Sequence, residues 1–551
     1  MKKHNRIIAA VMAVCLAGSV GFMPESIAPV VSMAESAEGV YTYENLTYTF
    51  LEDGTIEITG CDKSVAEVAI PKEIDGVKVT SIGYSAFYGY EGLISVTIPD
   101  SVTNIEKYAF SSCNSLTEIT IPDSVTSIGG WAFSETPWLK LKEEENPLVI
   151  VNNILISGKN SSGDVIIPDN VTSISEYAFS NCTDLTSIII PDSVINVSEN
   201  VFWHCTSLKY AKIGNGVTKI PGYGYTGPSG FFYECTNLET VVLPNNIEYI
   251  GENAFCYCNS LKNINFPEKI SHIGLMALEG TEWLNNQDDG LIYVGNIIYK
   301  YKGEMPENTE IILSSNTIGI SSFAFANSNN LSSIKLNNDL KYIEREAFAF
   351  CKNLKSLIIP DSVIVFENGI VDGCSSLKEL KLSENTPYLT RSFLNGSFAG
   401  GITHCDSLES LVIPCSVKKI DEFSLGDNPN LKSLIILNSD CEIIENAFKG
   451  VFADSIDSNP IIYGYESSTA QVYAEKYDYK FVSLGEAPKI FPTGDANDDG
   501  QFNIADLAVF RKFLFGSSDI KVSDWKDMDL TGDGVLDVFD YCLMKKKLIE
   551  K

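Results

Sequence analysis

The stretch "EKYAFSSCNSLTEITIPDSVTSIG", residues 106–129, recurs in close copy as "SEYAFSNCTDLTSIIIPDSVINVS" at residues 175–198. The shared unit is AFxxCxxLxxIxIPxxVxxI, with a period of 23 residues that persists, allowing for insertions, through about sixteen registers. Its Ala-Phe position falls on Ala86, Ala109, Ala132, Ala178, Val201, Phe231, Ala254, Ala277, Ala324, Ala347, Ile370, Gly401, Ser424 and Ala447. A period of this length predicts repeats that stack on one another.

Each repeat contains one predicted short strand, such as residues 116–122. In that strand Ile119 and Ile121 point to one side, and Glu118 and Thr120 to the other. A single repeat has no partner against which to bury its apolar side, whereas a stack of repeats forms one continuous core. The sequence therefore predicts a parallel β solenoid with a period of about 23 residues.

The cysteines follow the same register. Eight of the chain's 14 cysteines lie three residues after the Phe position or its equivalent: Cys113, Cys182, Cys205, Cys235, Cys258, Cys351, Cys374 and Cys405. Stacked side chains run parallel to one another, so we interpret this column as small buried residues and predict mostly free thiols.

The repeat pattern resembles the BspA-type leucine-rich repeats of bacterial surface proteins over residues 76–455. The resemblance implies a β-rich N-terminal cap at residues 35–75 and a capping segment at residues 456–484, where Ser468 is placed to cap a helix in "STAQVYAEKY". Two registers hold different sequences, "TPWLKLKEEENPLVIVNNILI" and "TEWLNNQDDGLIYVGNIIY", which we predict to be β-hairpin inserts.

The N-terminus and the charge indicate the compartment. Residues 1–34 combine Lys2, Lys3 and Arg6 with a long apolar run and end in "VSMA", which predicts a signal peptide cleaved after Ala34. The rest of the sequence lacks an apolar run long enough to predict a membrane span. A formal net charge of −32 disfavours nucleic acid and anionic membranes as partners. We expect a secreted, extracellular protein.

No catalytic constellation is evident in the repeats, so the sequence predicts no enzyme activity. "GYGYTG", residues 222–227, formally matches a dinucleotide-binding motif, but Pro228 follows it where a helix should begin. His204 and His404 each precede a column cysteine, and we interpret them as outward-facing residues rather than metal ligands.

The outward strand positions form a stripe along the stack: Thr97, Thr120, Ile166, Ile189, Lys212, Val242, Asn265, Lys335, Ile358, Lys381, Val412 and Ile435. Several exposed Ile and Val residues in one row are compatible with a contact face for a protein or a glycan. They are equally compatible with ordinary β-forming residues on an exposed sheet.

Near the C-terminus the composition changes. "DANDDGQFNIAD", residues 495–506, places oxygen ligands at positions 1, 3, 5, 7, 9 and 12 of a calcium loop, and "DLTGDGVLDVFD", residues 529–540, repeats the pattern. The predicted ligands of two Ca²⁺ ions are Asp495, Asn497, Asp499, the Gln501 carbonyl, Asn503 and Asp506, then Asp529, Thr531, Asp533, the Val535 carbonyl, Asp537 and Asp540.

Two features separate these loops from sensor EF-hands: position 12 is Asp in both, and Pro492 precludes a helix before the first loop. A duplicated loop and helix resembles a type I dockerin, covering residues 494–551 after a linker at 485–493. The resemblance implies calcium-dependent folding and binding to a cohesin module of a scaffoldin. It places cohesin contacts on Ile504, Ala505, Arg511, Lys512, Val538, Phe539, Lys545 and Lys546.

Many dockerins have Ser-Thr at loop positions 10 and 11, whereas this chain has Ile504-Ala505 and Val538-Phe539. The cohesin type therefore stays open, and the unlike copies disfavour two interchangeable binding modes. The leading hypothesis is a non-catalytic repeat protein, at the cell surface or in a cellulosome, that the dockerin anchors and whose solenoid binds a protein or glycan. The alternatives are an enzyme or enzyme accessory of cellulosomal polysaccharide degradation, and a passive structural spacer.

Overall fold

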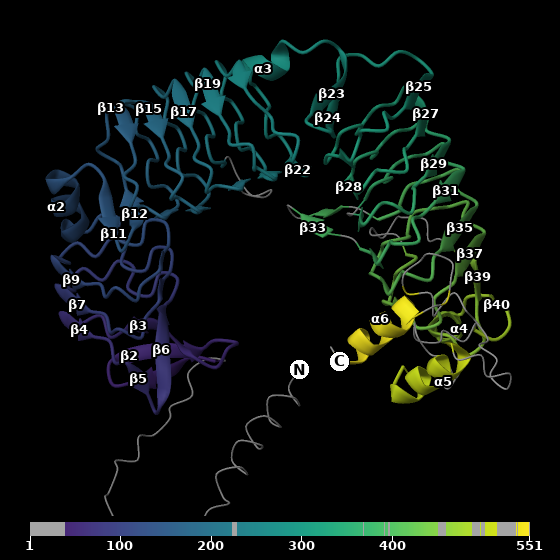
Figure 1. The fold of residues 1–551 in the computed structure, drawn as a ribbon, viewed down its shortest axis with the longest axis horizontal. Helices are drawn as coiled ribbons and strands as arrows, with labels where there is room; N and C mark the ends of the chain where they lie inside the picture. Colours follow the sequence, from purple (N-terminus) through teal and green to yellow (C-terminus); the bar gives the residue numbers. More distant parts are fainter. Residues whose placement is uncertain are drawn as a thin grey trace, which may run out of the picture. The chain divides into compact units, whose positions relative to one another are not determined.

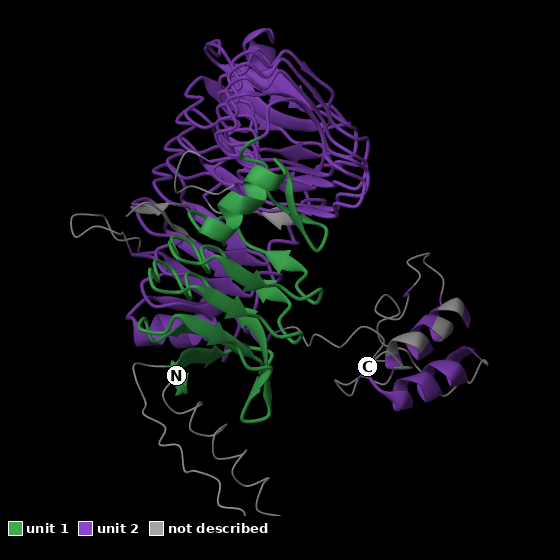
Figure 2. Ribbon diagram, turned by 90° about the vertical axis from the view of Figure 1, so that its left-hand side faces the viewer, with its two compact units in different colours: residues 1–160 green, residues 161–551 purple. Residues whose placement is uncertain are grey.

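The structure is a computed structural model. It describes residues 39–222, 229–366, 369–390, 392–394, 397–399, 401–449, 459–487, 502–514 and 538–549, together with 496, 530 and 536. The predicted signal peptide lies outside the described residues. The chain divides into two compact units, Met1–Asn160 and Ser161–Lys551 (Figure 2).

The first unit contains two sheets and one insert. One sheet has the strand order β1 (Tyr41–Tyr43), β2 (Leu46–Phe50), β3 (Ile56–Cys61), β6 (Val77–Ile82), β8 (Asn104–Ile105) and β10 (Ser127–Ile128), with β5 (Glu73–Ile74) paired to β6. The other contains β4 (Glu67–Ala69), β7 (Ser95–Thr97) and β9 (Glu118–Thr120). Strands β1 to β3 are antiparallel, and the repeats then add parallel strands.

The second unit contains two rows of parallel strands (Figure 1). The first row contains β13 (Gly163–Ile166), β15 (Leu185–Ile189), β17 (Tyr210–Lys212), β19 (Thr240–Val242), β21 (Asn263–Ile264), β25 (Thr309–Ile312), β27 (Leu331–Lys335), β29 (Ser356–Ile358), β31 (Glu379–Lys381), β35 (Ser410–Ile413), β37 (Ser433–Ile436), β39 (Ile461–Gly464) and β40 (Phe481–Ser483). The second contains β14 (Ser173–Ile174), β16 (Asn196–Val197), β18 (Lys219–Ile220), β20 (Tyr249–Ile250), β22 (His272–Ile273), β26 (Gly319–Ile320), β28 (Tyr342–Ile343), β30 (Val365–Phe366), β32 (Tyr388–Leu389), β36 (Lys419–Ile420) and β38 (Glu442–Ile443).

The inserts and the remaining helices complete the fold. Each predicted hairpin insert begins with a helix, α2 (Pro137–Glu145) or α3 (Glu282–Asn285), capped by the side chain of Thr136 or Thr281. Antiparallel pairs follow: β11 (Val149–Val151) with β12 (Ile154–Ser157), and β23 (Gly290–Val294) with β24 (Ile297–Lys302). A further pair joins β33 (Ser392–Leu394) and β34 (Ser397–Ala399), and the other helices are α4 (Thr469–Lys476), α5 (Ile504–Leu514) and α6 (Val538–Ile549).

The β solenoid fold is confirmed, and Ser468 caps α4 as predicted. The expectation of one strand per repeat was incomplete, because each coil contributes a second, two-residue strand. Its register equals the sequence period: Ser127 pairs with Asn104 one repeat earlier, and Ile128 with Ile105. Such a strand carries too few residues to show an alternating pattern in the sequence.

A third hydrogen-bonded face lies at the Ala-Phe turn. The Phe87 N–H donates to the carbonyl of Ala109 at 2.7 Å, and Phe232 N–H donates to Ala254 at 2.8 Å. Two left-handed residues flank each such turn, one before the Ala and one three residues after it. The first column contains Ser85, Tyr108, Trp131, Tyr177, Asn200, Asn253, Met276, Phe323, Glu346, Phe423 and Asn446, and the second contains Ser112, Glu135, Asn181, His204, Glu234, Tyr257, Asn327, Phe350, His404 and Asp427.

The predicted columns form the core. Phe202, Phe232 and Phe255 stack face to face, with ring centroids 5.1 and 5.6 Å apart, and all three are fully buried. The eight column cysteines are buried free thiols. Their Sγ atoms donate to a main-chain carbonyl of the preceding coil, for example Cys235 to Phe202 at 3.0 Å and Cys351 to Phe325 at 3.0 Å. The thiols thus provide hydrogen-bond donors for buried main-chain carbonyls and also fill space in the core.

These contacts predict a graded thiol reactivity. Burial raises the pKa of Cys113 to about 11 and that of Cys351 to about 12, so neither forms the reactive thiolate near neutral pH. Cys415, in contrast, is exposed. The measurement is the time course of the reaction of the folded protein with Ellman's reagent at about pH 8, near the ordinary cysteine pKa. We expect Cys415→Ser to lower the number of thiols that react in the fast phase by one per chain.

Denaturant should expose the remaining thiols. If almost no thiols react in denaturant without reductant, the column cysteines are not free and the prediction is wrong. It is also wrong if Cys351→Ser removes the fast phase of the folded protein.

Candidate functional site

Asp506, at position 12 of the first predicted calcium loop, lies in the first turn of α5 and is fully buried. Its Oδ1 accepts a hydrogen bond from the Ala496 N–H at 2.9 Å, and its Oδ2 accepts one from the Asn503 N–H at 2.7 Å. Asn503 in turn accepts from the Ala505 N–H with its side-chain oxygen, at 2.8 Å. The carboxylate therefore faces the loop rather than solvent.

Asp540 holds the equivalent place at the start of α6 and is also fully buried. A buried carboxylate is normally hydrogen-bonded, paired with a cation or bound to a metal ion, so the burial of both aspartates is compatible with their predicted role as calcium ligands. The other predicted ligands lie outside the described residues: Asp495, Asn497, Asp499, Gln501, Asp529, Thr531, Asp533, Val535 and Asp537. Within the described ranges, no three His, Cys, Asp or Glu side chains meet in a way that could hold a metal ion.

The two helices share a small apolar core. It contains Ala496, Phe502, Leu507, Phe510 and Met544, with the Phe510 and Tyr541 rings 6.4 Å apart across the two helices. In modules of this length, loops that bind metal ions commonly add to the stability that the apolar core supplies.

Most of the predicted cohesin contacts are on the surface. Ile504 is 80% exposed and Val538 is 57% exposed, although both are apolar. Ala505, Arg511, Lys512 and Lys545 are exposed as well. The side chains of Phe539 and Lys546 lie outside the described residues. Each helix start thus combines a buried aspartate with an exposed aliphatic residue two positions before it.

In the solenoid, His204 and His404 pair with carboxylates of the next or preceding coil. His204 Nδ1 lies 3.0 Å from Glu234 Oε2, and His404 Nδ1 lies 3.1 Å from Asp372 Oδ1. Both are partly exposed, in agreement with the interpretation of outward-facing residues. Asp372, the buried partner of His404, was not predicted from the sequence, because carboxylates at this position follow no period. Of "GYGYTG", residues 223–227 lie outside the described residues.

The predicted outward stripe is largely exposed, and its apolar members form short runs. Ile166 pairs with Ile189, and Val412 pairs with Ile435, on neighbouring strands, whereas Lys335 precedes the 52% exposed Ile358 by one repeat and Lys381 pairs with it. The stripe therefore carries small apolar patches divided by lysines rather than one continuous apolar face.

A different surface feature lies on the turns of the first unit. Tyr84, Tyr88, Tyr108 and Trp131 form an aromatic cluster, with Tyr108 5.8 Å from Tyr84 and 5.5 Å from Trp131 between ring centroids. Tyr84 is 67% exposed and Tyr88 is 52% exposed. Tyr108 and Trp131 both have left-handed backbones, with φ of 59° and 54°. The sequence pattern did not single out this cluster, because turn positions between the core columns vary freely.

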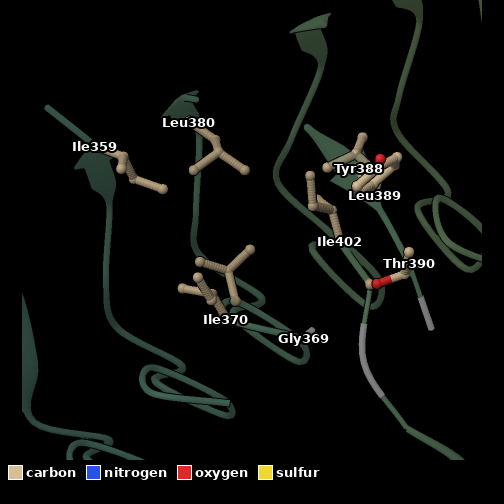
Figure 3. Close-up of a pocket in the computed structure, with 10 residues that line it drawn as sticks. Ile359, Gly369, Ile370, Leu380, Tyr388, Leu389, Thr390 and Ile402 are labelled. Carbon is tan, nitrogen blue, oxygen red and sulfur yellow. The ribbon is translucent and has the colours of Figure 1, made fainter. Parts of the chain in front are cut away.

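Two cavities in the second unit differ in character. One, of about 10 Å³, is lined by Ile359, Ile370, Leu380, Leu389 and Ile402, whose side chains face one another across successive coils (Figure 3). It is a packing gap, since its apolar walls offer water or a ligand few polar partners. The other, of about 260 Å³, is lined by polar and apolar side chains around Glu279 and Lys300.

Comparison with solved structures finds leucine-rich repeat proteins. One from Bacteroides ovatus is 24% identical over 80% of this chain and 99% of its own, with a TM-score of 0.29. One from T. pallidum is 26% identical over 40% of this chain and 89% of its own, with a TM-score of 0.25. The pneumococcal vaccine antigen PcpA is 16% identical over 82% of this chain and 99% of its own, with a TM-score of 0.28. No curated protein matches the chain.

Family models match both parts. The model of the BspA type leucine rich repeat region matches residues 60–160, 149–284, 296–400 and 399–469, well over half of the chain. The model of the dockerin type I domain matches residues 493–549. No helix among the described residues is both long and apolar enough to cross a membrane. The chain belongs to the BspA-type leucine-rich repeat proteins and carries a C-terminal type I dockerin domain.

Proposed function

We propose that this chain is a secreted, non-catalytic repeat protein that its dockerin fastens to a cohesin module of a scaffoldin. The solenoid then presents a surface that binds a protein or a glycan. The arrangement at the two helix starts supports the anchor: Asp506 and Asp540 are fully buried, while Ile504 and Val538 stand exposed two positions before them.

In this proposal, calcium holds the two loops of the dockerin in their folded conformation. The twelve loop ligands would hold two ions, with Asp506 and Asp540 closing their loops from the helix side. When bound, the ions neutralise the carboxylates that crowd each loop, which lets the chain fold around them. The loops then fix the direction of α5 and α6 and keep Ile504 and Val538 on the surface.

The aromatic cluster supports a binding role for the solenoid. A left-handed backbone costs an L-residue roughly 1–2 kcal/mol, and Gly or Asn tolerate it best. Tyr108 and Trp131 adopt it while their rings stay partly exposed, so burial of the rings recovers only part of that cost. Exposed aromatic residues on a rigid frame are typical of binding surfaces. A passive spacer would not need them.

The first prediction concerns calcium. We expect Asp506→Asn with Asp540→Asn to weaken calcium binding by at least about tenfold, because each substitution removes a charged ligand while preserving shape. Capture on a panel of immobilised cohesins in the presence of calcium should be lost, and chelator should abolish capture of the unsubstituted protein.

The matched control is Asp169→Asn with Asp339→Asn, two exposed aspartates of the solenoid, which should retain capture. Thermal unfolding of the solenoid should be the same in all three proteins. Capture that persists in chelator would contradict the calcium-dependent anchor.

The second prediction concerns the unlike copies. Ile504→Arg and Val538→Arg each place a charge on an exposed aliphatic site. Because the two copies differ at loop positions 10 and 11, only one substitution should weaken capture, by about 2 kcal/mol or roughly thirtyfold in Kd. Surface plasmon resonance on the captured cohesin measures both, and equal losses for the two variants would instead indicate two interchangeable binding modes.

The third prediction separates a binding protein from an enzyme. The purified full-length chain should release no reducing sugar from soluble cellulose, xylan or mannan beyond the buffer blank, since no catalytic constellation is evident in the repeat sequence. A commercial glucanase in the same buffer checks detection. Turnover that copurifies with the chain would favour the enzyme alternative.

A further inference from the structure

The larger cavity arises where the second insert interrupts the solenoid. In regular coils the second-row strand leads into the left-handed Ala-Phe turn, but β24 continues as a strand from Ile297 to Lys302. The coils on either side keep their turns, at Met276 and Phe323, both left-handed with φ of 57° and 58°. One turn is therefore missing between two present ones, and a space of about 260 Å³ remains between them.

The floor of this pocket is polar. Lys300 Nζ donates to Glu279 Oε1 at 2.7 Å, and Tyr299 Oη donates to the same oxygen at 3.4 Å. Tyr299 Oη also accepts from the Leu278 N–H at 3.1 Å, and burial raises the pKa of Tyr299 well above its usual value, so the hydroxyl stays neutral. Glu279 and Lys300 are about one-third exposed, which leaves both accessible from solvent.

The opposite wall of the pocket is formed by Ser322 and Phe323, which contact residues of the next coil. The Ser322 N–H and hydroxyl both donate to Glu344 Oε2, at 3.1 and 3.2 Å. Glu344 is buried, and its Oε1 lies 2.7 Å from His272 Nδ1. The Arg345 guanidinium lies 5.7 Å from the centre of the Phe323 ring. These contacts fix Ser322 and Phe323, and a fixed wall reduces the ordering that a ligand must impose.

The lining selects a class of ligand. Its two charges neutralise each other, so a ligand with a net charge would have to separate the Glu279–Lys300 pair. A carboxylate acceptor, an ammonium donor and two hydroxyls lie beside the apolar faces of Met276 and Phe323. A neutral molecule with hydroxyls on its edge and carbon on its face can satisfy both sets. The space of about 260 Å³ admits a small molecule of the size of a sugar ring.

We propose that this pocket binds a neutral sugar residue. Sugar hydroxyls would donate to Glu279 and accept from Lys300, while Phe323 and Met276 pack against the carbon face of the ring. This inference rests on the proposed function in one respect, the expectation that the solenoid carries a recognition surface, and it does not depend on the dockerin.

The test is isothermal titration calorimetry of the purified full-length protein, with calcium, against glucose, xylose, galactose, cellobiose and xylobiose. We expect at least one of these probes to bind saturably with Kd of about 0.1–1 mM. Glu279→Gln and Lys300→Met should each weaken that binding about tenfold or more, since each removes one partner of the sugar hydroxyls. Lys341→Met, an exposed lysine outside the pocket lining, should bind as the unsubstituted protein does.

Thermal unfolding checks that every variant is folded. If Lys300→Met does not fold, Glu279→Gln still tests the inference, because it preserves the shape of the side chain. Saturable binding of none of the sugars would overturn the inference, and so would equal binding by Glu279→Gln and Lys341→Met. Binding of glycine or another zwitterion in place of sugars would assign the pocket to a different ligand class and also overturn it. Cohesin capture, measured on the same samples, reports the anchor separately.

Discussion

The fold depends on one constraint: a coil of 23 residues cannot satisfy its own backbone or bury its own apolar side. The neighbouring coil supplies the missing hydrogen-bond partners and apolar contacts. The hydrogen bonds form in two strand ladders and in a third ladder at the Ala-Phe turn, where Phe N–H groups donate to carbonyls of the next coil. The first and last coils of such a stack lack a neighbour on one side. The antiparallel strands β1 to β3 occupy the beginning, and β40 with the apolar face of α4 occupies the end.

The turn ladder imposes a backbone conformation that side chains must tolerate. Two left-handed residues in each coil direct the N–H groups of the turn toward the next coil, as when His204 N–H donates to Tyr233. At these places the backbone is fixed by stacking while the side chain points away from the core columns. Tyr108, Trp131, His204 and His404 all occur there. Sequence variation at the turns therefore changes the surface of the solenoid with little effect on its core.

The same division explains how much the sequence could predict. The buried columns recur with the period, so the solenoid and the column of cysteines were predictable from spacing, and the helix capped by Ser468 was predictable from its capping residue and helix-forming sequence. The second strand of each coil was not, because Ser127–Ile128 is too short to alternate. The pocket was not either, since Glu279, Tyr299 and Lys300 meet only because β24 runs on where a turn belongs. In the dockerin, spacing predicted the ligands, and the structure adds that Asp506 and Asp540 are buried.

The solenoid and the dockerin gain stability from different sources, and this bears on how they could work as one protein. The solenoid is stabilised by stacked apolar columns such as Phe202, Phe232 and Phe255, which involve no metal ion. The described part of the dockerin has an apolar core around Phe510, and in the proposed anchor the cations that bind the loops would add to its stability. A fall in calcium should therefore release the proposed anchor before it disturbs the repeats. The sugar pocket proposed in the interrupted coil belongs to the metal-independent part, so ligand binding and anchoring would respond to separate conditions.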